Sequence, residues 1–294
     1  MKRLVLLSVA LVTFAMARAE FPGFSWTVGT DLVSTYLWRG LNLGGLSAQP
    51  DVMLGYGGLE VEAWANLGVL NYAFKDFANN NAFNPELDLT VSYSLFGARI
   101  GATHFHYFDG SRYFNLRNYG YQDYLNGNHT TDQLEVFAEF NLGELVEKVP
   151  LKIGWYTFVA GDDKYFVDPN GEYISAEDLE NVVDDEGYDV KRAFSTYIEL
   201  SYTAELPLGF SLIPTIGITP WRSQYTNYEQ KFAVNNISLK LNWELEVGEH
   251  FALDVYAMGM VNTYGINKDN LFLPLAQMND QRLNGAIGVG LWFY

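Results

Sequence analysis

The stretch Glu86–Tyr107, ELDLTVSYSLFGARIGATHFHY, decides the fold. Its first ten residues alternate without interruption between polar and apolar side chains. Successive side chains of a strand point to opposite faces, so this run predicts a strand with one apolar and one polar face. Phe96-Gly97 leaves room only for a tight turn before a second extended run, Ala98–Tyr107. The stretch therefore predicts a β-hairpin.

Such a hairpin fits two classes of all-β protein. In a soluble sandwich the apolar face looks into a core, whereas in a membrane barrel it looks into lipid and the polar face lines the lumen. The composition, with 20 Tyr, 20 Phe, 7 Trp and 27 Gly among 294 residues, is typical of many strands. Without cysteine, the chain is stabilised by backbone pairing and packing rather than by disulfides. No segment after the first twenty residues has the roughly 18 consecutive apolar residues of a membrane-spanning helix.

The N-terminus has the three parts of a secretory signal peptide. Lys2 and Arg3 precede an apolar run, Leu4–Met16, and Ala17-Arg18-Ala19 fits the small-x-small cleavage pattern. We therefore predict a signal peptide over residues 1–19 and a single barrel domain over residues 20–294. Cleavage would leave 15 basic residues against 35 acidic ones, a net charge of −20. This charge repels polyanions, so nucleic acid is not expected as a partner.

Twelve extended runs follow along the chain. Their approximate limits are Trp26–Trp38, Pro50–Tyr56, Leu59–Asn66, Glu86–Leu95, Ala98–Tyr107, Gln133–Phe140, Leu151–Ala160, Phe194–Ala204, Leu208–Ile218, Ala233–Leu245, Phe251–Val261 and Leu283–Tyr294. The eleven connections between them alternate strictly between long and short. An up-and-down barrel of the outer membrane has this arrangement, whereas a sandwich with Greek-key crossings has no reason for it.

We therefore predict an all-β, antiparallel, up-and-down transmembrane β-barrel of about 12 strands. Its short turns and both termini would lie on the periplasmic side, and its long loops outside the cell. Aromatic residues near the strand ends would form the two interfacial girdles: Trp26, Tyr36, Trp38, Tyr56, Tyr93, Trp155, Tyr202, Trp243 and Trp292. Two registers stay open: Arg99 suggests a bulge within residues 98–107, and aromatics fall on the small-residue face of residues 283–294.

One segment near the N-terminus carries a family resemblance. Ser34, Tyr36 and Arg39-Gly40 form a Ser-x-Tyr-x-x-Arg-Gly element, followed by Gln49-Pro50 and Gly57-Gly58. This pattern resembles the TorF-like (Gcw_chp) family of bacterial porin-like proteins. The aromatic end, Leu291-Trp292-Phe293-Tyr294, is similar to the signal by which the barrel assembly machinery recognises its clients. The resemblance implies a multi-pass barrel in the bacterial outer membrane, in contact with its lipid, and leaves the solute open.

The polar faces of the predicted strands supply the candidate solute path. It comprises Glu60, Glu62, Glu86, Asp88, Glu135, Glu139, Glu199, Glu244, Asp254, Lys152, Lys240 and Arg39. An acidic lining raises the local concentration of cations, which predicts cation preference. The same residues also fit a merely solvated face. We expect Arg39, at the end of the first run, to pair with a lumen carboxylate at the rim; binding of anionic groups is the alternative.

Other motifs give weaker signals. His104-x-His106 places two imidazoles on one strand face, but a third ligand is missing, so we predict no metal site and no cofactor. The acidic segment Gly161–Arg192 is interpreted as a solvated external loop. No hydrolase motif is present. A lipid hydrolase that pairs these histidines with Ser92 or Ser94 on the neighbouring strand is therefore the least favoured function.

The sequence thus favours a porin-like, non-enzymatic channel for passive diffusion of small hydrophilic solutes. The main alternative is a non-conducting barrel whose long acidic loops bind a surface partner.

Overall fold

Twelve strands close into one antiparallel barrel. The computed structural model describes residues 23–70, 85–108, 113–146, 149–175, 178, 187–229, 232–264 and 283–294. Within them the barrel strands are β1 (Phe24–Val33), β4 (Leu46–Tyr56), β5 (Leu59–Leu70), β6 (Glu86–Leu95), β7 (Ala98–Tyr107), β8 (Gln133–Asn141), β9 (Leu151–Gly161), β13 (Thr196–Tyr202), β15 (Phe210–Thr219), β16 (Ala233–Glu246), β17 (Phe251–Val261) and β18 (Leu283–Phe293).

Sequential neighbours pair around the barrel, and β1 pairs with β18 to close it. A short extra strand, β14 (Ala204–Glu205), continues β13 along β15. The prediction of a 12-stranded barrel is confirmed. None of the helices in the described ranges is long and apolar enough to cross a membrane. The predicted signal peptide, residues 1–19, lies outside the described residues.

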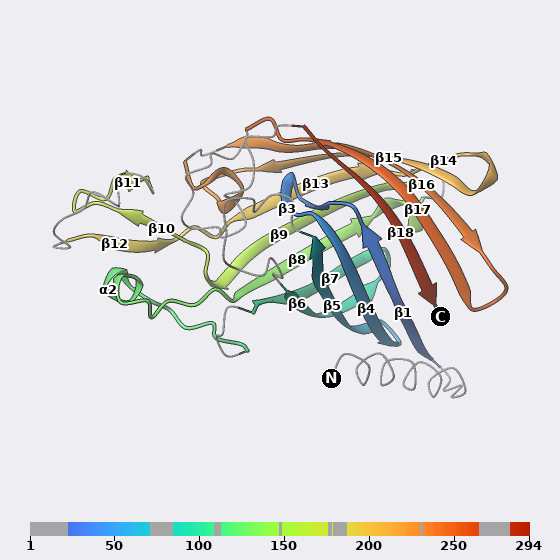
Figure 1. Ribbon diagram of the computed structural model, residues 1–294, viewed down its shortest axis with the longest axis horizontal. Helices are drawn as coiled ribbons and strands as arrows, with labels where there is room; N and C mark the ends of the chain where they lie inside the picture. The colour runs from blue at the N-terminus through green and yellow to red at the C-terminus, as the bar shows by residue number, and fades with distance from the viewer. Residues whose placement is uncertain are drawn as a thin grey trace.

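The two ends of the barrel differ as the connection lengths predict. Figure 1 shows short turns at the right-hand end, and longer connections with β10 (Lys164–Val167), β11 (Tyr173–Ile174), β12 (Asp189–Arg192) and α2 (Tyr121–Leu125) at the left-hand end. We call these the turn end and the loop end. The β6–β7 turn is built by Phe96 and Gly97, whose φ values of 50° and 75° are typical of a tight hairpin.

The outer wall is apolar and the lumen is polar. Along β6, Val91 and Tyr93 on the outer face are about half exposed, whereas Thr90 and Ser92 on the lumen face are buried. In β18 the exposed face carries Ile287, and glycines alternate with it on the lumen side. An exposed apolar face on a closed barrel would be costly in water, and it matches a lipid-facing wall.

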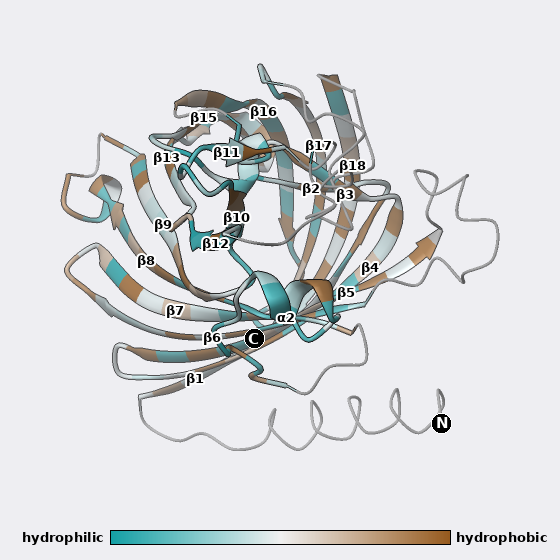
Figure 2. Ribbon diagram, turned by 90° about the vertical axis from the view of Figure 1, so that its left-hand side faces the viewer, coloured by the Kyte–Doolittle hydropathy of each residue, from teal (hydrophilic) through white to brown (hydrophobic). Residues whose placement is uncertain are grey.

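One predicted strand was wrong in its second half. Trp26–Trp38 was expected to run without a break, but β1 ends at Val33, and the chain then forms a hairpin of β2 (Tyr36–Trp38) and β3 (Leu41–Gly44). This plug hairpin, residues 36–44, lies within the ring of strands, as Figure 2 shows from the loop end. Arg39 and Gly40 form its turn with φ of 47° and 89°, values that strand residues do not adopt.

Two further expectations need correction. Tyr36 and Trp38 belong to the plug hairpin and Trp292 lies on the lumen parity of β18, so none of them joins an outer girdle. The bulge suspected near Arg99 is absent, because the register between β6 and β7 is continuous over both strands. Arg99 simply faces the lumen, together with the aromatic residues later in β7.

Candidate functional site

The loop half of the lumen is filled by an aromatic cluster. It consists of Tyr36, Leu41, Leu43, Phe105, Phe158, Tyr197 and Tyr225, with Trp38, Trp64, Tyr107 and Tyr156 packed against it. Phe158, Tyr197 and Tyr225 have no exposed surface at all. The plug hairpin supplies the centre of this cluster, and the walls supply the rest. Aromatic side chains of this size narrow the lumen of a twelve-stranded barrel at that depth.

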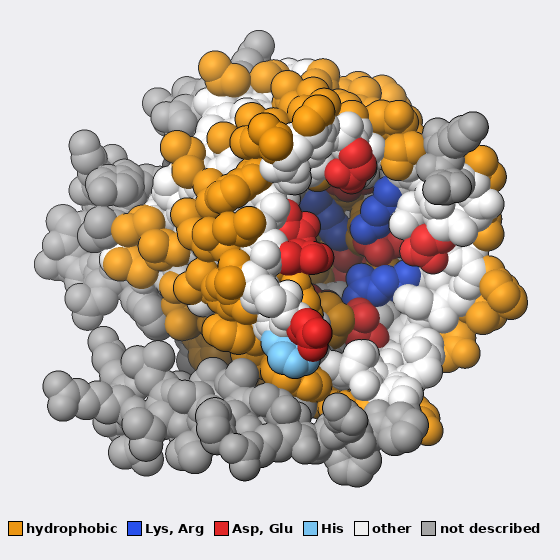
Figure 3. Space-filling model, turned by 90° about the vertical axis from the view of Figure 1, so that its right-hand side faces the viewer, with side chains coloured by type: hydrophobic (Ala, Val, Ile, Leu, Met, Phe, Trp, Pro, Cys, Tyr) orange, Lys and Arg blue, Asp and Glu red, His pale blue; other side chains and the backbone are white. Residues whose placement is uncertain are grey.

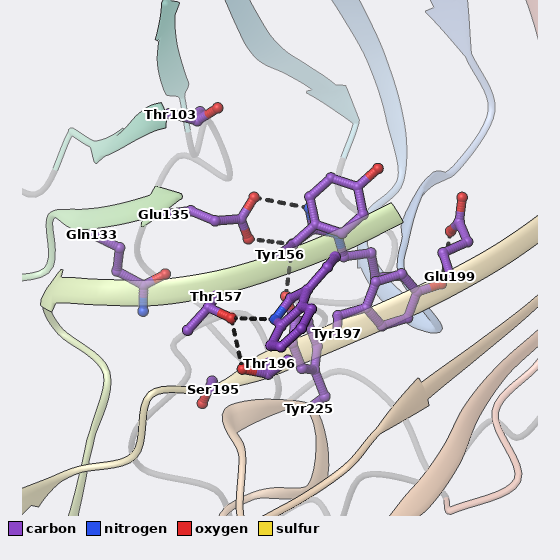
Figure 4. A network of polar contacts seen from close by, with 12 residues as sticks. Thr103, Gln133, Glu135, Tyr156, Thr157, Ser195, Thr196, Tyr197, Glu199 and Tyr225 are labelled. Carbon is purple, nitrogen blue, oxygen red and sulfur yellow. Dashed lines mark hydrogen bonds and ion pairs between the residues drawn. The ribbon is translucent and has the colours of Figure 1, made fainter. Parts of the chain in front are cut away.

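Arg39 anchors the plug hairpin. Both of its terminal nitrogens donate to the Glu135 carboxylate, one of them at 2.9 Å, and one also donates to the Tyr225 hydroxyl at 2.8 Å. Its guanidinium carbon lies 3.9 Å from the centroid of the Tyr156 ring and 5.3 Å from that of Tyr197. In Figure 4, Glu135 and the three tyrosines surround the same point. A bidentate pair with stacked rings is the geometry that arginine favours and lysine cannot reproduce.

The hairpin is also tied to the opposite wall. Asn235 donates to the carbonyl of Arg39 at 2.9 Å, and Asn262 donates to the carbonyl of Gly40 at 3.0 Å. A side chain at Gly40 would have its Cβ 2.0 Å from the backbone oxygen of Asn235, so only glycine fits. The predicted pairing of Arg39 with a lumen carboxylate is present, but it lies inside the lumen instead of at the rim.

The turn half of the lumen is open and charged. Figure 3 looks into it from the turn end and shows acidic and basic side chains in a hollow with hydrophobic side chains around it. Arg99 lies 2.7 Å from Glu60 and 3.5 Å from both Glu62 and Glu139, and Lys152 lies 2.9 Å from Glu139. These side chains are partly exposed, so water screens their pairing.

The remaining predicted path residues also face the lumen. Glu199 accepts from the Tyr197 hydroxyl at 2.8 Å, and Lys240 lies over the Tyr256 ring at 4.2 Å. Glu86 is buried and hydrogen-bonds the hydroxyls of Tyr36 and Tyr107. Glu244 is exposed near the turn end, and Asp254 accepts from Asn242 at 3.4 Å.

Two cavities flank the plug hairpin. The first cavity, of about 310 Å³, lies against β4–β6 and β17–β18 and has Asp88, Trp64 and Tyr256 in its lining. The second, of about 340 Å³, lies against β9, β13 and β15–β17 and is lined in part by Arg39, Glu199 and Lys240. Leu37, Trp38 and Met258 line both, so the two cavities meet around the hairpin.

The histidine pair lies outside the lumen. His104 Nε2 is 2.9 Å and His106 Nδ1 is 2.7 Å from the Asp132 carboxylate, and the rings of Phe114 and Tyr113 cover the two imidazoles. The third polar partner missed in the sequence is thus Asp132, which directly precedes β8. In the described part of the chain no group of three or more potential ligands is arranged to hold a metal ion.

The serine and histidine positions do not form a catalytic group. Ser92 lies on the buried lumen face of β6, where it accepts from Arg99 at 3.1 Å. Ser94 shares its parity, whereas His104 and His106 lie on the outer face of β7. The strand wall separates the serines from the histidines. The serine–histidine pairing that a lipid hydrolase would need is therefore not formed.

The acidic segment before β13 is partly structured. β10, β11 and β12 form a small sheet, and Asp168 accepts the backbone amides of Asn170 and Glu172 in a turn. Tyr121 of α2 packs against Phe166 and Ile174 of this sheet. Glu177, Glu180 and Asp184–Glu186 lie outside the described residues.

Two carboxyls join this layer to the barrel. Asp162 accepts from the Tyr119 hydroxyl, and Asp163 accepts from the backbone amide of Ser195 at 2.8 Å. Burial raises the pKa of Asp162 to about 7 and that of Asp163 to about 6. Below about pH 6, both carboxyls are therefore mostly protonated in the folded chain.

Comparisons with known proteins give distant structural similarities. No family model matches the chain, and no curated protein matches it. Among solved structures, a complex of Salmonella typhi OmpF with daunomycin is 10% identical with a TM-score of 0.36, covering 92% of this chain and 96% of that chain. An anion-selective porin from Comamonas acidovorans is 10% identical with a TM-score of 0.31, covering 93% and 74%. Wzi, a carbohydrate-binding β-barrel of capsule assembly in Escherichia coli, is 6% identical with a TM-score of 0.29, covering 96% and 86%.

Proposed function

We propose that this protein is a porin-like channel of the bacterial outer membrane, through which small hydrophilic solutes diffuse passively and cations pass in preference to anions. The turn end would face the periplasm and the loop end the outside of the cell. The exposed apolar wall would contact outer-membrane lipid. The aromatic end of β18, beside the seam with β1, would be recognised by the barrel assembly machinery.

The charge of the lumen carries this proposal. Its carboxylates outnumber its basic groups: Asp31, Asp51, Glu60, Glu62, Glu86, Asp88, Glu135, Glu139, Glu199, Glu244 and Asp254 stand against Arg39, Arg99, Lys152 and Lys240. A narrow lumen with low-dielectric walls concentrates the potential of such a lining, which attracts cations and repels anions. The two cavities beside the plug hairpin supply space along this lining.

Planar-bilayer recording of the purified, folded protein tests the proposal. We expect a small single-channel conductance, because the aromatic cluster narrows the loop half of the lumen. In a gradient of potassium chloride, the reversal potential should take the sign of cation preference. A folded protein that inserts and carries no current would contradict the channel function, and a reversal potential of the opposite sign would contradict the cation preference.

The buried aromatic cluster favours one alternative function. If the plug hairpin stays in place, the barrel is a closed support for the loop end, where α2 and the β10–β12 sheet share an apolar cluster. Such a layer would bind a partner at the cell surface. Two results together would support this alternative. Planar bilayers that contain the folded protein would carry no current. The purified protein would bind to intact cells, and a variant with a short linker in place of residues 162–192 would not.

A further inference from the structure

We propose that the first cavity binds a small organic cation that carries an ammonium group, with Asp88 as its counter-ion. This inference rests on the proposed channel function and names a class of solute for it. It is based on one observation: a carboxylate oxygen of Asp88 without a hydrogen-bond partner lies at a cavity lined by aromatic residues.

Asp88 has an unsatisfied oxygen. Its Oδ1 atom is buried and has no hydrogen-bond partner. The charged groups that act on Asp88 are Glu86, Glu135, Glu62 and Arg39, and Arg39 is already held by both oxygens of Glu135. A buried carboxylate among other carboxylates is unfavourable unless a cation or a donor reaches it. A bound ammonium group would supply both.

The rest of the lining suits an ammonium group better than an anion or a neutral sugar. Four aromatic residues line the cavity, namely Tyr36, Trp38, Trp64 and Tyr256. Aromatic faces attract ammonium groups, so a lining of this composition favours an organic cation. Two other polar groups are already occupied, because Gln49 donates to Asn66 at 3.2 Å and the Tyr36 hydroxyl bonds Glu86.

The wall of the cavity already interacts with one ammonium group. Lys240, which lines the second cavity, places its Nζ atom 4.2 Å from the centroid of the Tyr256 ring. The Tyr256 ring fits there because its neighbour on β18 is Gly288. A Cβ at that position would lie 2.3 Å from the tyrosine ring. The cavity volume of about 310 Å³ accommodates a small alkylammonium ion with part of its hydration shell.

The two cavities differ in charge, which locates the site. The first has Asp88 as the charged residue of its lining, whereas the second contains both Arg39 and Lys240 beside Glu199. An organic cation is therefore expected in the first cavity and repelled by the basic groups of the second. This difference separates the proposal from general cation attraction by the whole lumen.

Isothermal titration calorimetry on the purified full chain in detergent tests the site without requiring conductance. Choline is the probe, and its neutral carbon analogue, in which a tert-butyl group replaces the trimethylammonium group, is the matched control ligand. We expect choline to bind at least tenfold more tightly, because a charge-assisted contact and ring contacts add to the shared apolar contact.

Asp88→Asn is the decisive variant, since it removes the charge and preserves the shape. It should abolish the preference for choline over the neutral analogue, and Trp64→Leu should weaken choline binding severalfold. Glu172→Gln, which neutralises an exposed carboxylate in the turn before β11, outside the lumen, should leave binding unchanged. Each variant is first shown to be folded by its β-sheet circular dichroism spectrum.

The outcomes separate this inference from the channel proposal. Equal binding of the two ligands, or unchanged choline binding by Asp88→Asn, overturns the ammonium site even if the protein conducts. Choline binding that depends on Asp88 supports the site, and it does so even if bilayers stay silent and the channel proposal fails.

Discussion

Arg39 and Arg99 are both lumen arginines paired with glutamates, yet they differ in burial, in the number of their carboxylate partners and in their contacts with aromatic rings. Arg39 is almost buried, bidentate to a single carboxylate and stacked on aromatic rings. Arg99 is partly exposed and shared among Glu60, Glu62 and Glu139. The first arginine fixes a segment in place, whereas the second lies among carboxylates in the open turn half of the lumen. The loop half of the lumen is thus built like a protein core, and the turn half like a pore lining.

Breaking the Arg39 pair should have the largest effect. Arg39→Ala leaves Glu135, whose side chain is 2% exposed, without its counter-ion. Removing one partner of a buried pair costs about 3–5 kcal/mol, so we expect a large loss of stability against urea in lipid vesicles. The plug hairpin should also loosen, and the single-channel conductance should rise severalfold.

The double variant Arg39→Ala/Glu135→Gln provides the control for that prediction. Because it also removes the unpaired negative charge of Glu135, it should recover part of the lost stability, while the conductance stays high. Wild-type stability and conductance in the single variant would show that the hairpin is held by its aromatic contacts alone.

Changing the pH should affect the loop end next most strongly. The raised pKa values of Asp162 and Asp163 mean that the folded chain keeps protons that the unfolded chain has released between about pH 4 and pH 7. The contacts of Asp162 and Asp163 are therefore most stabilising below this window and weaken as the pH rises through it, by about 1.4 kcal/mol for each unit by which a pKa is raised. Hydrogen exchange of amides in α2 and β10, corrected for intrinsic rates, should show less protection at pH 8 than at pH 5.

Asp162→Asn is the matched variant, since an amide does not titrate. Its protection should vary less with pH than that of the wild-type protein. Protection that increases with pH in the wild-type chain would contradict the assignment of neutral, buried carboxylic acids at this junction.

Changing Arg99, the partly exposed arginine, should have the smallest effect on stability. Arg99→Gln removes a partly screened charge, so we expect a change below about 1 kcal/mol. The reversal potential in a salt gradient should shift toward stronger cation preference, because three carboxylates lose their shared counter-ion. Lys152→Gln, beside Glu139, should give a shift of the same sign. A loss of stability as large as that of Arg39→Ala would remove the distinction between the two halves of the lumen.

The barrel itself was predictable from the sequence because its signals are local. Alternation over Glu86–Leu95 defines two faces, and the Phe96-Gly97 turn fixes their register with β7. Alternating long and short connections then distinguish a barrel from a sandwich. Each of these features depends on neighbours in the chain or on adjacent strands, which is why the strands could be placed within a few residues, apart from the end of the first one.

The plug hairpin could not be predicted, because its residues continue the apolar alternation of β1. In the sequence, Tyr36 and Trp38 look like lipid-facing residues. Side chains that pack into an aromatic lumen show the same apolar alternation as side chains that face lipid. The sequence signal that was available is Arg39-Gly40, a pair suited to a tight turn. Likewise, Asp132 meets the histidines only because the β7–β8 register places it opposite His106, and no spacing rule in the sequence contains that register.

The contacts of Arg39 also affect how long the barrel stays folded. They join positions 96, 186 and 196 residues apart in the chain, from Glu135 to Tyr225 and Asn235. Contacts of such high contact order close large loops, so they form only when much of the wall is already paired. Interactions made late in folding mainly slow unfolding. The plug hairpin is therefore expected to set the lifetime of the folded cylinder more than the speed at which it forms.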